Sequence, residues 1–108
     1  MSREDIIKEG LRKTKKAIIK MLDNTDAEDT KRRVKIKTNL YLEVICARVG
    51  KDDEEDVLGF YVPVGTPISI ELYIIKNEEC IDGLTCRNIY KQDAMDDEIY
   101  YLLNCYVD

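Results

Sequence analysis

The first 22 residues alternate apolar and charged positions with the period of an α-helix. At about 100° per residue, the apolar and the basic side chains fall on opposite arcs. The pattern predicts an amphipathic helix over residues 2–22, with Ser2 as its N-cap and Gly10 allowing close approach of another backbone. The apolar arc holds Ile6, Ile7, Leu11, Ala17, Ile18, Met21 and Leu22. The basic arc holds Lys8, Arg12, Lys13, Lys15, Lys16 and Lys20.

Residues 34–75 are predicted to contain four strands. Residues 23–33 are polar throughout and are expected to be a linker. In residues 34–37, apolar and basic positions alternate, which predicts a half-exposed strand. Residues 40–49 are apolar on both faces and predict a central strand. Residues 57–64 and 68–75 predict two more strands, the first with Pro63 at an edge or bulge and the two separated by a turn over residues 65–67.

The Asp82-Gly83 pair predicts a β-hairpin between the apolar stretches on either side of it. In a two-residue turn Cys80 faces Thr85, so Cys80 and Cys86 point to opposite faces of the sheet and cannot bridge. A five-residue loop would instead make the two cysteines partners. The direction of both thiols therefore depends on the turn type.

The C-terminal residues 99–107 fit two patterns. Ile, Tyr, Cys and Val favour a strand there, which we expect to follow one helical turn within residues 91–98. The same region also carries apolar side chains at helical spacing, with Asp93 as a candidate cap. These side chains are Met95, Ile99, Leu102, Leu103 and Tyr106. Together the patterns predict one α+β domain over residues 1–108, with the N-terminal helix on an antiparallel sheet or small barrel of about five or six strands.

Composition narrows the function classes. The chain has 108 residues, 44% hydrophobic and 36% charged, which is typical of a soluble globular protein. No apolar run approaches the ~18 residues of a membrane span, and no export signal is evident, so we expect a cytoplasmic protein. Histidine is absent, which excludes Ser-His and Cys-His nucleophiles and histidine metal sites. No phosphate-loop motif occurs, so we expect no enzyme activity and no cofactor.

The four cysteines, Cys46, Cys80, Cys86 and Cys105, do not form the close pairs typical of zinc sites, so no metal is expected. Cys46 and Cys105 stand among apolar residues, and we expect both to pack in the interior.

Charge is divided along the chain. Residues 1–37 carry twelve Lys/Arg against seven Asp/Glu, whereas residues 38–108 carry five against fifteen. The division predicts two electrostatic faces on one small domain.

The leading hypothesis is a non-enzymatic protein–protein interaction domain, an inhibitor or adaptor that can also self-associate. Two acidic clusters would imitate phosphates and occupy a basic groove on a nucleic-acid-handling partner, while exposed tyrosines hold it. Small acidic proteins that phages carry against restriction or CRISPR nucleases have this general composition, an analogy of size and charge only. The simpler interpretation of the acidic clusters is solvated turns. The candidate partner-binding residues are Asp52, Asp53, Glu54, Glu55, Asp56, Tyr73, Asp96, Asp97, Glu98 and Tyr100, with Asp93 beside the second cluster.

Two alternatives stay open. One is a nucleic-acid-associated module that uses the basic helix and linker, although the acidic remainder of the chain would repel a polyanion. The other is a small-ligand or nucleotide pocket on the sheet, without catalysis. A membrane-surface helix is disfavoured because its apolar arc lacks aromatic residues. The candidate nucleic-acid-binding residues are Lys8, Arg12, Lys15, Lys16, Lys20, Lys31, Arg32 and Arg33.

Overall fold

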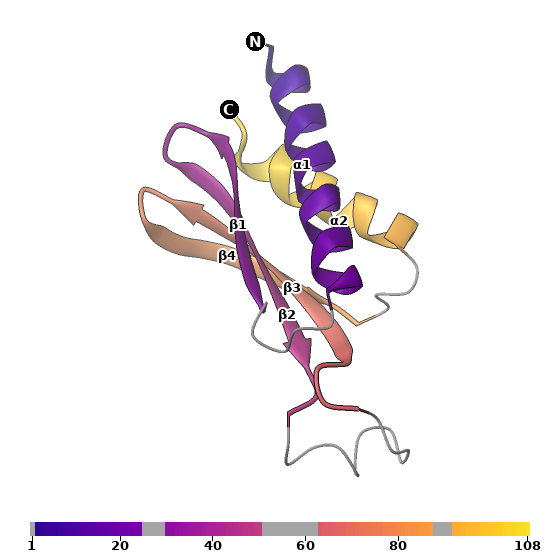
Figure 1. Ribbon diagram of the computed structural model, residues 1–108. Coiled ribbons are helices and arrows are strands. Elements are labelled where there is room, and N and C mark those ends of the chain that lie inside the picture. The colour runs from indigo at the N-terminus through magenta and orange to yellow at the C-terminus, as the bar shows by residue number, and fades with distance from the viewer. Residues whose placement is uncertain (1, 25–29, 51–62, 88–91) are drawn as a thin grey trace.

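An antiparallel sheet carries two helices on one of its faces (Figure 1). The computed structural model describes residues 2–24, 30–50, 63–87 and 92–108. Within these ranges, one helix precedes and one follows a run of four strands. The elements are α1 (Arg3–Asp23), β1 (Lys31–Lys37), β2 (Leu40–Arg48), β3 (Pro67–Lys76), β4 (Glu79–Cys86) and α2 (Gln92–Tyr106). The predicted α+β class and antiparallel sheet are confirmed.

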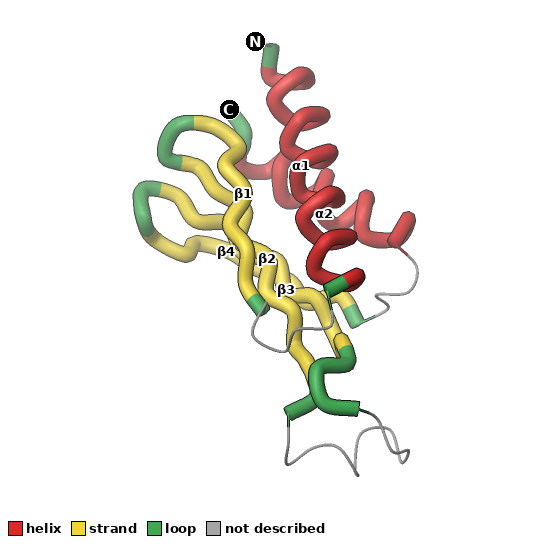
Figure 2. The backbone as a smooth tube through the Cα atoms, viewed as in Figure 1, coloured by secondary structure: helices red, strands yellow, loops and turns green. Residues whose placement is uncertain are grey.

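The described strands form an open sheet in the order β1-β2-β3-β4, so β1 and β4 are its edges (Figure 2). The prediction of five or six strands, or of a barrel, is not confirmed. Most of the predicted strand over residues 57–64 lies outside the described residues, and Pro63 and Val64 are not in a strand. The predicted turn over residues 65–67 falls slightly earlier, at Val64 and Gly65, and β3 begins at Pro67.

Helix α1 forms where the apolar period predicted it. Ser2 caps its start, because the Ser2 hydroxyl accepts a 3.2 Å hydrogen bond from the Asp5 backbone N–H. The apolar arc faces the sheet and contributes fully buried side chains such as Ile18 and Met21. A Cβ on Gly10 would lie 3.1 Å from the side chains of both Ile36 and Leu103. The close approach at this glycine is therefore by side chains of β1 and α2, not by another backbone.

Strand β1 begins at Lys31, three residues before its predicted start. Lys31, Arg32 and Arg33, which were expected in the linker, pair with residues 43–45 of β2. Their charge hid the strand from the hydrophobic pattern, yet basic side chains are common on edge strands, where they block pairing with other chains. This shift fixes the positions of Arg32 and Arg33 beside α1.

The C-terminal segment is helix α2, and the prediction of a strand over residues 99–107 is wrong. Packing of the apolar side chains at helical spacing outweighs the strand propensity of the individual residues, because in a helix these side chains together cover the apolar face of the sheet. Of these side chains, Met95, Ile99, Leu102 and Leu103 are buried to 2% exposure or less. The single helical turn expected within residues 91–98 is the first part of this longer helix.

The predicted hairpin at Asp82-Gly83 is also wrong. The turn between β3 and β4 lies at Asn77 and Glu78, whose φ angles are 52° and 68°. Two consecutive positive φ angles are those of a tight hairpin turn. The strand pairing then places Asp82 opposite Ile74 and inside β4.

Gly83 has a different role from the one its sequence suggested. It pairs with Tyr73, and a Cβ at Gly83 would lie 2.5 Å from the Tyr73 ring. The Tyr73 ring therefore lies over Gly83, in the space that a side chain would otherwise fill. The pairing also shifts register between Ile74 and Ile75, so Cys80 faces Ile75 and Cys86 faces Ile70. The predicted pairing of Cys80 with Thr85 does not occur.

Helix α1 lies over β1 and β2, and α2 lies over β3 and against α1. The core between the helices and the sheet contains Leu42, Val44, Leu72 and Ile74 from the central strands. Arg3 joins the two chain ends: its guanidinium donates to the Val107 and Asn104 carbonyl oxygens at 2.8 and 2.6 Å. Neither described helix is long and apolar enough to cross a membrane.

Candidate functional site

The most distinctive surface of the described chain is the outer side of α1. Its basic positions recur every three or four residues, so they form a row along the helix on the side opposite its buried arc. Lys13, Lys16 and Lys20 are exposed in this row. A shallow hollow along the same side is lined by Lys8, Leu11, Arg12, Lys15, Lys16, Ile19 and Lys20.

Strand β1 extends this surface sideways. An open groove of about 300 Å³ runs between α1 and the sheet edge. Among the described residues, its lining contains six cationic residues and no carboxylate. The lining residues are Arg12, Lys13, Lys16, Ala17, Lys20, Arg32, Arg33 and Val34. Seven of the eight predicted nucleic-acid-binding residues thus line the hollow or the groove, and Lys13 joins them as a residue that the prediction omitted.

Not every cation on this surface is available. Lys15 turns toward α2, where its Nζ lies 3.0 Å from both carboxylate oxygens of Asp96. Arg33 turns to the other face of the sheet, where its guanidinium lies 5.7 Å from the centre of the Tyr41 ring and 3.4 Å from Glu43. Both charges are partly neutralised in these positions.

The remaining cations define what we call the basic face. Arg12 pairs with Glu9 across one helical turn, and this hydrogen bond lowers the pKa of the Glu9 carboxyl. Among the described residues, no carboxylate forms an ion pair with Lys13, Lys16 or Lys20. The basic face consists of Lys8, Arg12, Lys13, Lys16 and Lys20, and Arg32 lies beside it in the groove.

Lys31 does not belong to the basic face. Its Nζ lies 2.7 Å from the carboxylate of Glu43, which is only 5% exposed although it lies on the sheet face that the helices leave open. Arg33 contacts the same carboxylate, so two basic side chains compensate a nearly buried charge. This cluster stabilises the open face of the sheet and has no free ligand-binding charge.

The second acidic cluster is dispersed by helix α2. Asp96 is held by Lys15, whereas Asp97, one residue on, is exposed. Glu98 lies close to Cys86 of β4. Burial of the Cys86 thiol raises its pKa most, and the nearby Glu98 charge raises it further. Asp96 to Glu98 therefore do not present one anionic surface. The side chain of Asp93 and the acidic run of residues 52–56 lie outside the described residues.

The predicted tyrosines lie on separate surfaces. Tyr73 alternates with the buried Leu72 and Ile74, so it lies on the sheet face opposite the helices. Tyr100 is 44% exposed on the outer side of α2, and its neighbour Tyr101 is 62% exposed. The structure therefore does not join Tyr73 and Tyr100 into one contact surface. Tyr101 was missed because the C-terminal segment was expected to be a strand.

None of the four cysteines, all of which are described, is in a disulfide, and their surroundings differ. Cys46 is buried, as predicted. Cys105 is exposed, so its predicted packing in the interior is wrong, and the reason is that α2 turns this position away from the sheet. In the described residues, no group of three acidic or thiol side chains is arranged to hold a metal ion.

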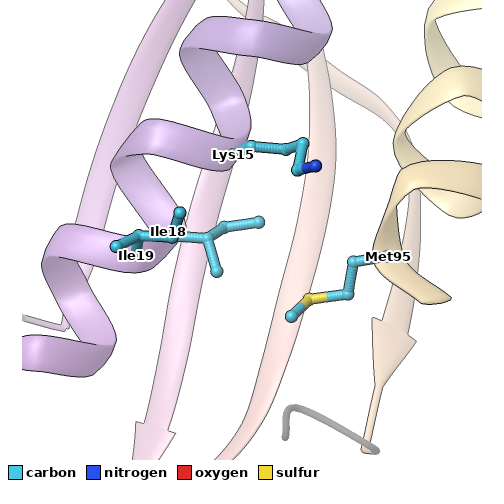
Figure 3. Close-up of a pocket in the computed structure, with 4 residues that line it drawn as sticks. All are labelled: Lys15, Ile18, Ile19 and Met95. Carbon is cyan, nitrogen blue, oxygen red and sulfur yellow. The ribbon is translucent and has the colours of Figure 1, made fainter. Parts of the chain in front are cut away.

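A small hollow between the two helices has little room for a ligand. Lys15, Ile18 and Ile19 of α1 line it on one side and Met95 of α2 on the other (Figure 3). Its volume of about 10 Å³ accommodates roughly one water molecule. This hollow gives no support to the small-ligand alternative.

Comparisons with protein-family models, with curated proteins and with solved structures give no match to this chain.

Proposed function

We propose that the protein is a non-catalytic binding domain whose basic face holds the phosphate backbone of a nucleic acid. The observation that carries this proposal is the groove between α1 and β1, whose described lining contains five cationic residues besides Arg33, which contacts Glu43, and no carboxylate. Phosphate neutralisation by Lys and Arg supplies most of the affinity of sequence-independent nucleic-acid binding. The runner-up of the sequence hypotheses thus becomes the favoured one.

Two features of the cations support this role. Lys13, Lys16 and Lys20 are exposed and make no ion pair with described residues, so a phosphate would not have to displace a carboxylate. Helix α1 also holds their backbones in a fixed row, which reduces the ordering cost of binding. The net charge of −5 for the whole chain limits the contact to this face, because other surfaces repel a polyanion.

The test is a fluorescence-anisotropy titration of a labelled 20-base-pair duplex with the protein at about 0.1 M salt. We expect dissociation constants in the range of roughly 1–100 μM, the usual range of sequence-independent binding. Changing Lys13, Lys16 and Lys20 together to Gln removes three charges and should weaken binding at least about tenfold. Because all three side chains are exposed, the variant should remain folded.

A matched control removes the same charge elsewhere. Lys35, Lys37 and Arg87 lie outside the basic face, and their joint change to Gln alters the net charge equally. This control should retain binding within about threefold, since only local charges release counterions from the bound duplex. An equal loss in both triple variants would reduce the proposal to a net-charge effect and contradict it.

A second candidate function is self-association through the outer side of α2. Tyr100 and Tyr101 are large exposed aromatic side chains on one helix, with the exposed Asp97 one turn away. Tyrosine is enriched in protein interfaces because it combines apolar area with a polar tip. Sedimentation velocity over a hundredfold concentration range tests this directly. We expect a dimer in the wild type and a monomer when both tyrosines are changed to Ser.

A further inference from the structure

The chemistry of the basic face also indicates which form of nucleic acid it binds. Every described side chain that lines the hollow or the groove is either cationic or aliphatic. The aliphatic ones are Leu11, Ala17, Ile19 and Val34. The described part of neither lining contains an aromatic ring, an amide or a carboxylate. Tyr41, which lies under Arg33, is on the other face of the sheet.

The missing side-chain types are the ones that bases require. Proteins that bind single strands combine a basic groove with aromatic rings on which successive bases stack, worth roughly 1–3 kcal/mol per base. In a groove, Asn or Gln reads adenine and Asp or Glu reads cytosine, whereas Arg or Lys reads only guanine. The lysines that dominate the basic face carry compact charges on flexible stems, which suit phosphates better than the fixed donor pattern of a base pair.

The spacing of the cations favours a dense, rigid array of phosphates. From Lys8 to Lys20 the row covers twelve residues, or roughly 18 Å of helix at 1.5 Å per residue. Over this length a duplex presents about ten charges, at one per ~1.7 Å, whereas one strand of the same geometry presents about half as many. A flexible single strand would also lose conformational freedom along a straight helix, with no stacking to compensate.

We infer that the partner of the basic face is a nucleic-acid duplex, held through its phosphates without regard to base sequence. This inference rests on the proposed function and narrows it. It predicts that binding depends on charge density and duplex geometry, and that exchanging the base sequence has little effect.

A competition experiment tests the inference with the full chain. The labelled 20-base-pair duplex is displaced by unlabelled competitors: duplexes of two unrelated sequences, a 20-nucleotide oligo-dT, poly-glutamate of matched charge, and vesicles rich in phosphatidylserine. We expect the two duplexes to compete within about twofold of each other and the oligo-dT to compete at least about fivefold more weakly. Poly-glutamate and vesicles should be weaker than the duplexes.

The outcomes separate this inference from the proposed function. Oligo-dT that competes as well as the duplexes, or a tenfold preference for one duplex sequence, overturns the inference but leaves nucleic-acid binding intact. Equal competition by poly-glutamate or by vesicles overturns it as well, by making the face a general acceptor of anions. No binding of any labelled nucleic acid overturns the proposed function itself.

Discussion

Tyr106 at the end of α2 donates a 2.6 Å hydrogen bond from its hydroxyl to Oδ2 of Asp82, in the middle of β4. The other oxygen of Asp82 accepts a 2.7 Å bond from the Gly83 backbone N–H. This pair ties the C-terminal helix to the edge of the sheet, although 24 residues separate its members in sequence. Because the carboxylate is the acceptor, the bond needs Asp82 ionised and Tyr106 neutral.

The pH dependence of this bond follows from the two pKa shifts. The hydrogen bond to Asp82 raises the pKa of Tyr106 from its ordinary 10.0 to about 12. The bond thus contributes fully below pH 10, and its contribution is lost as pH rises through about 12. The Tyr106 hydroxyl and the Gly83 N–H lower the pKa of Asp82 below 3.8, so the contribution is present above that pH and lost in stronger acid.

We therefore expect Tyr106→Phe to lower the urea midpoint of unfolding between about pH 4 and pH 10, with a smaller effect in stronger acid as Asp82 becomes protonated. Absorbance titration of tyrosinate should show a group with a pKa of about 12, and Asp82→Asn should return this pKa toward 10.0. Burial and the Glu71 charge also raise the pKa of Tyr73, so the group is assigned with Tyr106→Phe, which removes it. Tyr101→Phe is the control, because this side chain is 62% exposed. A group with a pKa of about 12 that survives Asp82→Asn unchanged would contradict the assignment to Tyr106.

Gly83→Ala should destabilise the protein by about 1–3 kcal/mol, because the new methyl group would overlap the Tyr73 ring. Urea unfolding of the single variant measures the loss. In a Tyr73→Val background the same change should cost less, since the ring is gone. Equal losses in both backgrounds would show that the glycine is needed for the backbone instead.

Leu103 and Cys105 distinguish the strand and the helix that the sequence of residues 99–107 allowed. In a strand these positions share one face, whereas in α2 Leu103 is fully buried and Cys105 is exposed. Leu103→Ala should cost about 2–5 kcal/mol of unfolding free energy. Cys105→Ala should stay within about 0.5 kcal/mol. Similar losses at both positions would favour the strand.

The hydrophobic pattern predicted the elements in which apolar residues repeat at regular spacing over several turns or residue pairs. Helix α1 and strand β3 carry enough periodic positions to predict both the element and its buried side, whereas β2 was predicted from a run that is apolar on both faces. Strand β1 was recognised from Val34 and Ile36, but its first three residues are charged and their pairing depends on the extent of β2. The basic groove could be anticipated from its residues, but its width depends on that pairing.

The errors share a physical cause. At Gly83 and in α2 a local preference conflicted with contacts made far away in sequence. Asp82-Gly83 is a strong turn signal by itself, yet Tyr73 and Tyr106 use these residues inside a strand. The acidic cluster of α2 was read as one surface, but Lys15 on another helix holds Asp96. Such conflicts are settled only by tertiary packing.

The thiols provide a chemical test of the described surfaces. Cys80 and Cys105 are exposed and should react first with a maleimide or a disulfide reagent at pH 8. Cys86 should react more slowly, because burial raises its pKa, and the buried Cys46 should react only on unfolding. Peptide mass spectrometry over time assigns each site. Early labelling of Cys46 would contradict its place in the core.

The most direct test of the central claim is the salt dependence of duplex binding by the wild type and by the Lys13, Lys16 and Lys20 triple-Gln variant. For the wild type we expect the logarithm of the affinity to fall linearly with the logarithm of salt concentration, with a slope of about −4 to −5 for the five cations of the basic face. Each lysine removed should reduce the slope by about one, so the variant should give about −1 to −2. A wild-type slope near zero, or an unchanged slope in the variant, would contradict phosphate binding at the basic face.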